Sequence, residues 1–224
     1  MPSVATGSPG VGMTLLDALG VPYTSIGKPT FEGIVVSARR TEGRVSGNRV
    51  NLFARVPAWE ISSCKSSGEI LSRFGYMGAE GEQRLYCTVR AGEPNSQGLF
   101  LEVSRVDGLL LERARLEAGP VAVVAWKLSD LRDRLAATHR ESMWVTASAI
   151  ERRGREYFHY RRATYSPAPL LDRLAPLLQN GTITVDHLIE RRSGRVSEKG
   201  PLFKIKPQNL EALFPIAITF DLLA

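Results

Sequence analysis

The chain has 224 residues, 43% of them hydrophobic, and it carries a formal net charge of +6 at pH 7 with a pI near 9.6. Its two cysteines, Cys64 and Cys87, stand outside any CxxC or Cys/His pattern, which argues against a disulfide framework and a structural zinc site. No apolar run reaches the roughly 18 residues of a membrane-spanning helix, and residues 1–12 are too polar and glycine-rich for a signal peptide, so we expect a soluble cytoplasmic protein.

The first half of the chain alternates short apolar runs with turn residues. Helical spacing of apolar residues predicts helices over residues 12–20 and 67–76. Alternating or continuous apolar runs predict strands over residues 31–38, 50–55, 84–90, 98–103, 108–114 and 121–126. The last run is apolar and β-branched, so we expect it at the centre of a sheet.

The second half shows clearer periodicity. Leu128, Leu131 and Leu135 recur at helical spacing and predict an amphipathic helix over residues 128–138. Residues 143–152 and 156–162 flank the turn Arg153-Gly154-Arg155 and predict a β-hairpin. A leucine-rich helix over 169–179 ends at Asn180-Gly181, and a short helix over 209–214 precedes a closing apolar strand.

These elements indicate an α/β or α+β protein with a central mixed sheet flanked by helices. We expect residues 1–11 to be flexible and residues 12–224 to form a single domain. Two lobes within it would divide near residue 125, giving segments of about 12–125 and 126–224.

The positive charge is concentrated in arginine clusters. The planar arginine fork suits both phosphates and guanine edges. The alternative is a set of solvated loops or exposed strand faces, and charge alone does not decide between the two. The clustered arginines are Arg39, Arg40, Arg44, Arg49, Arg152, Arg153, Arg155, Arg191, Arg192 and Arg195.

Seven stretches from about residue 10 to the C-terminus form an ordered set: GVGMTLLDALG, KPTFEGIVVSARR, NRVNLFARVPAW, VAWKLSDLRDRL, MWVTA, NGTITVDHLIERR and EKGPLFKIKPQNLEALFP. Together they resemble the MvaI/BcnI restriction endonucleases, relatives of the mismatch-repair nicking enzyme MutH. The resemblance implies a restriction-endonuclease-like PD-(D/E)xK fold with a DNA-binding cleft, dependent on Mg²⁺ in active members. It makes residues 12–125 the former catalytic lobe and 126–224 the recognition lobe.

The catalytic pattern of this family resembles P-D-x-x-G-I-E-x-K, with a further glutamate on the first helix. Two carboxylates hold Mg²⁺ there, and the lysine orients the attacking water. Residues 29–37 read PTFEGIVVS, so the matching positions are Thr30, Val35 and Ser37, and the helix position is Leu16. Valine cannot ligate a hard cation, and neutral hydroxyls do not replace two carboxylates. We therefore expect no metal cofactor and no cleavage of DNA.

An active nuclease with relocated carboxylates is the first alternative, and it alone would require Mg²⁺. Glu32 and Asp17 are the candidates. Glu32, however, precedes the motif glycine, and Asp17 lies about 100° around its helix from Leu16. A second alternative is a protein-interaction subunit of a defence or restriction system that has lost its affinity for DNA.

The resemblance also implies which residues contact DNA. Arg39, Arg40, Asn48 and Arg49 follow the former catalytic strand and are expected at phosphates or in the minor groove. The segment 186–206 resembles the base-reading region. Its candidates are Asp186, His187, Arg191, Arg192 and Lys199 for base edges and Lys204 and Lys206 for phosphates. A solvated basic loop and a structural His187 are the alternatives, and we expect His139 and His159 to be structural or exposed.

The leading hypothesis is a catalytically inactive protein that binds double-stranded DNA at a specific or modified site. Its partners would be that DNA and, in addition, an active nuclease or another defence subunit. No membrane partner is expected.

Overall fold

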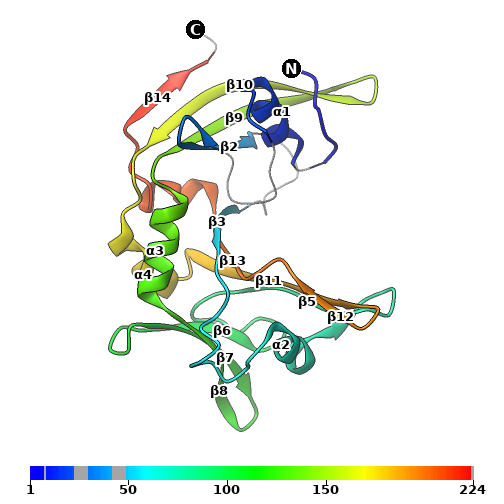
Figure 1. The fold of residues 1–224 in the computed structure, drawn as a ribbon, viewed down its shortest axis with the longest axis vertical. Coiled ribbons are helices and arrows are strands. Elements are labelled where there is room, and N and C mark those ends of the chain that lie inside the picture. The colour runs from blue at the N-terminus through cyan, green and yellow to red at the C-terminus, as the bar shows by residue number, and fades with distance from the viewer. Residues whose placement is uncertain (8, 23–29, 42–48, 223–224) are drawn as a thin grey trace. The chain divides into compact units, whose positions relative to one another are not determined.

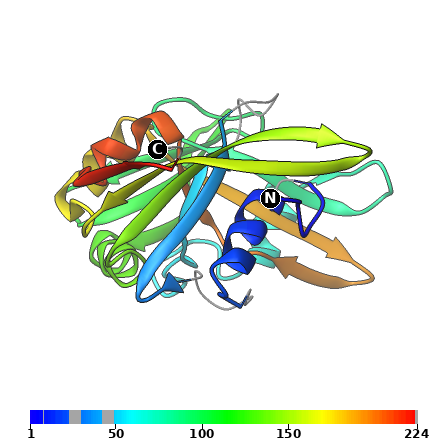
Figure 2. The same ribbon diagram turned by 90° about the horizontal axis from the view of Figure 1, so that it is seen from above.

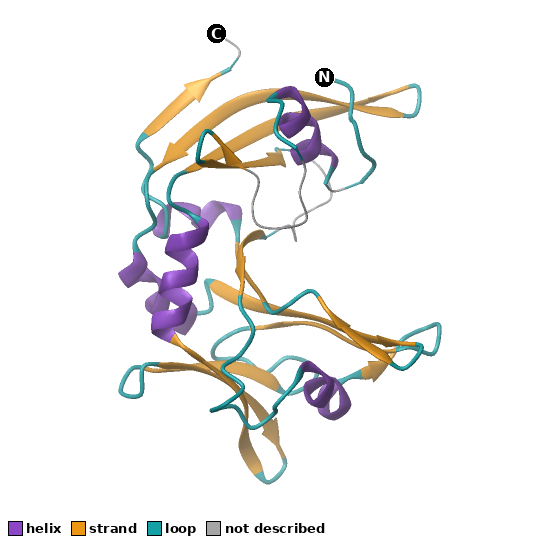
Figure 3. Ribbon diagram, viewed as in Figure 1, coloured by secondary structure: helices purple, strands orange, loops and turns teal. Residues whose placement is uncertain are grey.

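A computed structural model describes residues 1–7, 9–22, 30–41 and 49–222. Over these residues the protein is a mixed α and β structure with three sheets (Figures 1 and 3). The predicted combination of helices with a mixed sheet is confirmed, but the described strands form three sheets instead of one central sheet. The chain divides into two compact units, which are described separately: unit 1 comprises Met1–Asn48, Ala136–Leu170 and Glu211–Ala224, and unit 2 comprises Arg49–Leu135 and Leu171–Leu210. The expected lobe boundary near residue 125 falls inside unit 2.

Unit 1 is built on a five-stranded mixed sheet of order β1-β2-β9-β10-β14. Strand β2 runs parallel to β9, and the other neighbours are antiparallel. The bounds are β1 Thr30–Phe31, β2 Ile34–Arg40, β9 Ser142–Arg152, β10 Arg155–Ser166 and β14 Ile218–Asp221. The predicted hairpin is confirmed as β9 and β10, which extend beyond the rest of the sheet (Figure 1).

One face of this sheet is covered by helix α1, Gly10–Ala18, which packs against β2 (Figure 2). Val11 of the helix forms a buried cluster with Ala147 and Phe158 of the hairpin. The hydroxyl of Tyr160 also donates to the carbonyl of Val11 at 2.7 Å. The helix thus begins two residues before the predicted start and is held to the sheet by apolar burial.

The segment before α1, which the sequence analysis takes as flexible, pairs with the hairpin. The amide of Phe158 donates to the carbonyl of Met1 at 2.7 Å, and the amide of Ser3 donates to the carbonyl of Glu156 at 2.8 Å. Pro2 and Tyr157 form an antiparallel bridge between these bonds. The N-terminal residues therefore extend the β-structure of β10.

Unit 2 contains two sheets. The larger has the order β3-β13-β11-β5-β4, and β12 also pairs with β11; the smaller has the order β6-β7-β8. Strand β8, expected at the centre of a sheet, is an edge strand that pairs with β7. The bounds are β3 Val50–Ala54, β4 Tyr76–Met77, β5 Gln83–Val89, β6 Leu99–Ser104, β7 Leu109–Leu116, β8 Gly119–Lys127, β11 Ile183–Arg192, β12 Arg195–Glu198 and β13 Leu202–Ile205.

Aromatic packing and helices close one side of the larger sheet. Phe203 of β13 stacks on Phe53 of β3 at 4.7 Å between ring centroids, and Trp126 meets Phe203 edge-on at 5.8 Å. The N-terminus of α2, Ser67–Phe74, is capped by the hydroxyl of Ser66, which accepts from the amide of Glu69. The free thiols Cys64 and Cys87 lie in this unit, Cys64 fully buried and Cys87 partly buried.

The remaining helices agree with the periodicity of the second half. Helix α3 spans Leu128–Thr138 as predicted and buries its three leucines. Helix α4, Leu174–Gln179, follows the 3₁₀ turn η1, Leu171–Arg173, and ends at Asn180-Gly181; a second 3₁₀ segment, η2, spans Pro207–Ala212. Among the described residues, no helix is long and apolar enough to span a membrane.

Candidate nucleic-acid interface

Strand β2 carries Val35 and Ser37, the residues matched in sequence to the motif glutamate and lysine, on one face of the unit 1 sheet. Val35, Ser37 and Arg39 alternate along the strand, so their side chains point to the same side. Val35 is only 3% exposed, Ser37 is partly buried and Arg39 is exposed. The backbone of Thr30 pairs with that of Val35 across the β1–β2 ladder, although the side chain of Thr30 lies outside the described residues.

The donor set at these positions does not suit a divalent metal. Hard cations such as Mg²⁺ require several oxygen ligands, of which carboxylates are the strongest. Val35 and Leu16 are buried apolar residues, and Leu16 is 4% exposed. Within the described ranges, no group of three or more His, Cys, Asp and Glu side chains could hold a metal.

The two alternative carboxylates lie away from these strand positions. Glu32 occupies the two-residue turn between β1 and β2 with a left-handed φ of 50° and is exposed. Asp17 is exposed on α1, next to the buried Leu16. Neither carboxylate therefore occupies the position of a motif residue on β2.

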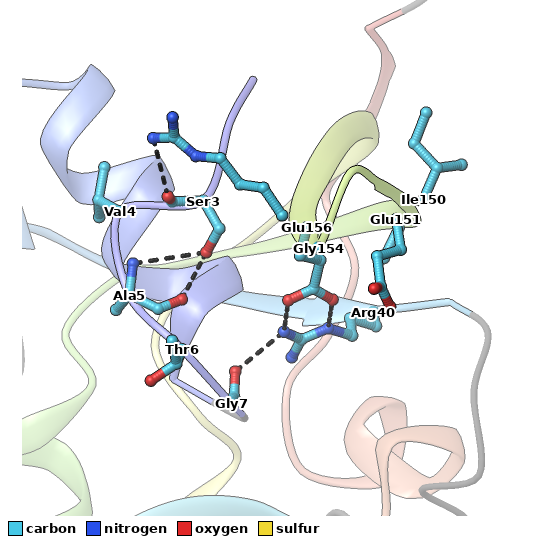
Figure 4. A pocket seen from close by; sticks show the side chains of 12 residues that line it. Ser3, Val4, Ala5, Thr6, Gly7, Arg40, Ile150, Glu151, Gly154 and Glu156 are labelled. Atoms are coloured by element: carbon cyan, nitrogen blue, oxygen red, sulfur yellow. Dashed lines mark hydrogen bonds and ion pairs between the residues drawn. The ribbon is translucent and has the colours of Figure 1, made fainter.

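Arg40, predicted as a DNA contact, has its side chain on the opposite face of β2 from Arg39. It donates two hydrogen bonds to the carboxylate of Glu156, at 2.7 and 2.6 Å, and one to the carbonyl of Gly7 at 3.0 Å (Figure 4). Its guanidinium also lies 5.0 Å from the ring centroid of Phe158. These contacts belong to the wall of a cavity of about 730 Å³. The interactions of Arg40 are thus internal, and its role is to tie β2 to the hairpin and the N-terminal segment.

Alanine substitutions of Arg39 and Arg40 should have different effects on the stability of the protein. We expect Arg40→Ala to lower the free energy of unfolding by roughly 1–2 kcal/mol, because a bidentate and partly buried ion pair is lost. Arg39→Ala should change it by less than about 0.5 kcal/mol, since that side chain is exposed. Urea unfolding of both variants measures this; equal losses would contradict the assignment of Arg40 to a structural role.

The face of β2 that carries Arg39 continues across the hairpin as a basic surface. Cross-strand partners share a face, and the register pairs Arg39 with Thr146, Thr146 with Arg162, and Arg152 with Arg155. We call Arg39, Arg152, Arg155 and Arg162 the unit 1 basic face. Along β9 it extends from Thr146 to Arg152, about 20 Å at the usual rise of a strand. All four arginines are exposed.

Sequence reasoning did not select Arg152, Arg155 or Arg162 as site residues. Part of the signal was present in the alternation of β9, where Thr146, Ser148, Ile150 and Arg152 occupy every second position and three of the four are polar. This pattern could not be interpreted without the pairing of β2 with β9, because that pairing places Arg39 of β2 and the alternating residues of β9 on one face.

In unit 2, Asp186 is the centre of a charged cluster. Asp186 is 6% exposed, and its carboxylate accepts hydrogen bonds from the Arg49 guanidinium at 2.9 Å and from the Thr88 hydroxyl at 2.8 Å. It also forms ion pairs with Arg49 at 2.8 Å and with Lys204 Nζ at 2.9 Å. Arg49 also donates to the hydroxyl of Thr184. We call these five residues the Asp186 cluster. Both carboxylate oxygens are engaged, so Asp186 orients Arg49 and Lys204, and the formal charges of the cluster sum to +1.

A cavity of about 400 Å³ lies beside the Asp186 cluster. Arg49, Thr88 and Thr184 line it together with Arg90 and Lys206. Arg90 is neutralised by Glu93 at 2.6 Å, whereas Lys206 is exposed and has no ion-pair partner among the described residues. Lys206 therefore extends the positive charge of the cluster toward solvent.

His187, predicted to contact DNA, is fully buried, so that prediction is wrong. Its Nε2 lies 2.8 Å from the carboxylate of Glu112, and its Nδ1 lies 3.9 Å from that of Glu198. Burial alone lowers the pKa of the imidazole, but the two carboxylates outweigh it and raise the pKa to about 10. His187 is thus a cation inside unit 2 that joins β11 to β7 and β12.

The residues predicted to read bases on β11 lie on opposite faces of the strand, because successive side chains alternate. Asp186 and Arg192 lie on one face of β11, and His187 and Arg191 lie on the other. Arg191 donates to the side chains of Gln83 at 3.0 Å and Ser72 at 3.3 Å. The predicted set therefore does not form one surface.

Arg192 and Lys199 are the exposed candidates of this region. The side chain of Arg192 is 64% exposed, and its Nε lies 3.5 Å from Glu190. Lys199 is exposed beyond β12. Asn48 lies outside the described residues. His139 is buried beside Ser142, and His159 is exposed, as expected.

Comparisons with known proteins identify the family of the chain and its fold. The family model described as MvaI/BcnI restriction endonuclease family matches residues 1–214. A solved complex of the restriction endonuclease MvaI with its cognate DNA substrate is similar over 99% of this chain and 91% of that chain, with a TM-score of 0.82 and 17% sequence identity. MvaI in the absence of DNA is similar over 91% and 82%, with a TM-score of 0.60 and 16% identity. No curated protein matches the chain. The structural likeness establishes an MvaI-like fold.

Proposed function

Because the chain belongs to the MvaI/BcnI restriction endonuclease family, we propose that it binds double-stranded DNA at a specific or modified site without cutting it. One observation carries the second half of this proposal. The strand that holds the family's catalytic motif has a buried valine, Val35, and a serine, Ser37, where the motif has a glutamate and a lysine.

The Mg²⁺ ion that the family implies does not fit these residues. An apolar Val35 and the hydroxyl of Ser37 provide neither the negative charge nor the ligand number that the ion requires. No catalytic step is therefore assigned to a metal in this protein.

Two surfaces support DNA binding. The unit 1 basic face presents four exposed arginines, and the Asp186 cluster with Lys206 adds positive charge in unit 2. The loss of carboxylates also removes negative charge that would repel phosphates in the absence of a metal. The likeness to MvaI, which was solved with its cognate DNA, is consistent with this role.

The proposal predicts no cleavage of duplex DNA. Supercoiled plasmid incubated with the pure protein and Mg²⁺ or Mn²⁺ should stay supercoiled, and the affinity for a short duplex should be the same with either ion or with a chelator. The physical reason is the missing carboxylate ligands at Val35 and Leu16.

Carboxylate variants provide the control for this experiment. If nicking occurs and disappears in Glu32→Gln or Asp17→Asn, the protein is an active nuclease with relocated carboxylates. Nicking that survives in both variants indicates a contaminating nuclease, which an independently purified preparation would lack.

A protein-interaction subunit is the second candidate, favoured by the edge strand β14. Ile218 and Phe220 alternate on one face of this strand and are each about half exposed, followed by the equally exposed Leu222. A partner such as an active nuclease or another defence subunit could cover them. Selection from randomised duplexes, with and without methylated cytosine, discriminates the two candidates: no preferred duplex and no affinity above background favours the interaction subunit.

A further inference from the structure

The same residues recur at the ends of two β-hairpins. Residues 150–155 read IERRGR, and residues 189–195 read IERRSGR. The first stretch closes the β9–β10 hairpin of unit 1 through Arg153-Gly154, and the second closes the β11–β12 hairpin of unit 2 through Ser193-Gly194. We call these ends the unit 1 tip and the unit 2 tip.

Both tips are two-residue turns with left-handed backbone. The φ angles are 51° and 73° at Arg153 and Gly154, and 48° and 78° at Ser193 and Gly194. Turns of this kind favour Asn, Asp or Gly at the first position, where a side chain with a long aliphatic stem is disfavoured. Arg153 therefore occupies its position against the local conformational preference.

Each tip also places two arginines directly opposite each other. Arg152 pairs with Arg155, and Arg192 pairs with Arg195, in the ladders that flank the turns. Cβ atoms of such pairs lie about 4.5–5.5 Å apart, and like charges at this separation destabilise a hairpin. A hairpin selected for stability alone would carry opposite charges here.

The protein leaves most of this charge unneutralised. Among the described residues, Arg152, Arg153, Arg155 and Arg195 have no carboxylate within ion-pair distance, and Arg155 donates only to the carbonyl of Ser3 at 3.3 Å. Glu156, the next residue, points to the other face and holds Arg40. Among the described residues, the unit 1 pair thus presents two guanidinium groups that have no carboxylate partner. The unit 2 pair presents one, Arg195, because Arg192 lies 3.5 Å from Glu190.

We infer that the two tips bind backbone phosphates of duplex DNA. Each arginine pair receives an anion that relieves the repulsion between its members, and the guanidinium fork matches phosphate geometry. Arg152 and Arg155 belong to the unit 1 basic face, and Arg192 shares its face of β11 with Asp186. The inference rests on the proposed function and assigns its phosphate contacts to two elements that lie outside the catalytic motif.

Matched charge removal tests each tip. The variants are Arg152→Gln/Arg155→Gln, Arg192→Gln/Arg195→Gln and a control, Arg73→Gln/Arg115→Gln, which removes two exposed arginines from α2 and β7. Two lost phosphate contacts should lower the log–log salt slope by roughly 1.8 and the affinity at 0.1 M salt by about 60-fold, equally on all sequences. The control should change the affinity by no more than about threefold, because screened charges act weakly.

Variants in the two turns distinguish a loss of DNA affinity caused by charge removal from one caused by a less stable fold. Arg153→Asn creates an Asn-Gly turn, so the melting temperature should be unchanged or higher while the affinity falls by about eightfold, the effect of one phosphate contact at 0.1 M salt. Ser193→Asn should likewise preserve or raise the melting temperature, because it also creates an Asn-Gly turn. Affinity lost together with thermal stability in Arg153→Asn would contradict the inference.

The outcomes distinguish this inference from the function on which it rests. A parent protein that binds no duplex at low salt overturns both. A parent that binds duplex, with tip variants equal to the control, overturns the inference and leaves the proposed function standing. Polyglutamate that displaces duplex DNA from the parent at equal charge concentration, but not from the tip variants, would assign the tips to an acidic protein partner instead.

Discussion

Replacing His187 by alanine is expected to lower the free energy of unfolding by about 3–5 kcal/mol, since it leaves a buried carboxylate without its cation. Glu112 is fully buried, and its hydrogen bond of 2.8 Å to Nε2 of His187 is the bond that would be lost. Urea unfolding of the parent and the variant measures the difference. His159→Ala is the matched control, because His159 is exposed and its loss should cost less than about 0.5 kcal/mol.

A double variant tests whether the loss of stability in His187→Ala comes from the broken ion pair or from the lost volume of the imidazole ring. Glu112→Met/His187→Leu removes both charges and fills the space with apolar atoms, so it should be more stable than His187→Ala. A double variant that is as unstable as the single variant would show that packing around the imidazole dominates.

The same pair makes stability depend on pH in a defined direction. Glu112 and Glu198 raise the pKa of His187 from 6.5 to about 10 against the opposing effect of burial. The folded state therefore binds the proton more tightly than the unfolded state. This contribution is complete below about pH 6.5, declines as the pH rises, and is lost above about pH 10. The urea midpoint of the parent should fall between pH 7 and pH 10 more steeply than that of the double variant; parallel profiles would contradict the assignment.

Replacing Asp186 by asparagine should lower stability and raise general affinity for DNA at the same time. The expected cost is about 1–3 kcal/mol, because the ion pairs with Arg49 and Lys204 are lost and the hydrogen bond from Arg49 is weakened. The formal charge of the cluster would rise from +1 to +2. One added phosphate contact would raise the affinity for a scrambled duplex by about eightfold at 0.1 M salt, and the ratio between preferred and scrambled duplexes should fall.

Asp133→Asn serves as the control for Asp186→Asn. Asp133 is an exposed carboxylate of α3, so its replacement changes the net charge equally without releasing a cation of the cluster. Binding measured against salt concentration reports the slope for each variant. If Asp186→Asn weakens binding to every duplex, Asp186 is needed to hold Arg49 and Lys204 in a binding geometry. The predicted gain in affinity for DNA is then wrong.

The sequence by itself determined the elements whose signal is local. Leucines at helical spacing defined Leu128–Thr138, and the Arg153-Gly154 turn between two alternating runs defined the hairpin. The family, too, was recognisable from ordered short stretches, and a match over residues 1–214 confirms it. The prediction that Thr30, Val35 and Ser37 stand at the positions of the catalytic motif also came from the sequence alone, because it depends on residue identity and spacing.

Only the tertiary structure decided which of these residues share a surface. Asp186 and His187 are neighbours in the sequence, yet one joins a polar cluster and the other is buried against Glu112. Arg39 and Arg40 are separated in the same way, because successive side chains of a strand point to opposite faces. Periodicity shows that two faces exist, but burial depends on which distant strand or helix covers each face. The parallel pairing of β2 with β9, which joins residues about one hundred positions apart, leaves no local signal for that choice.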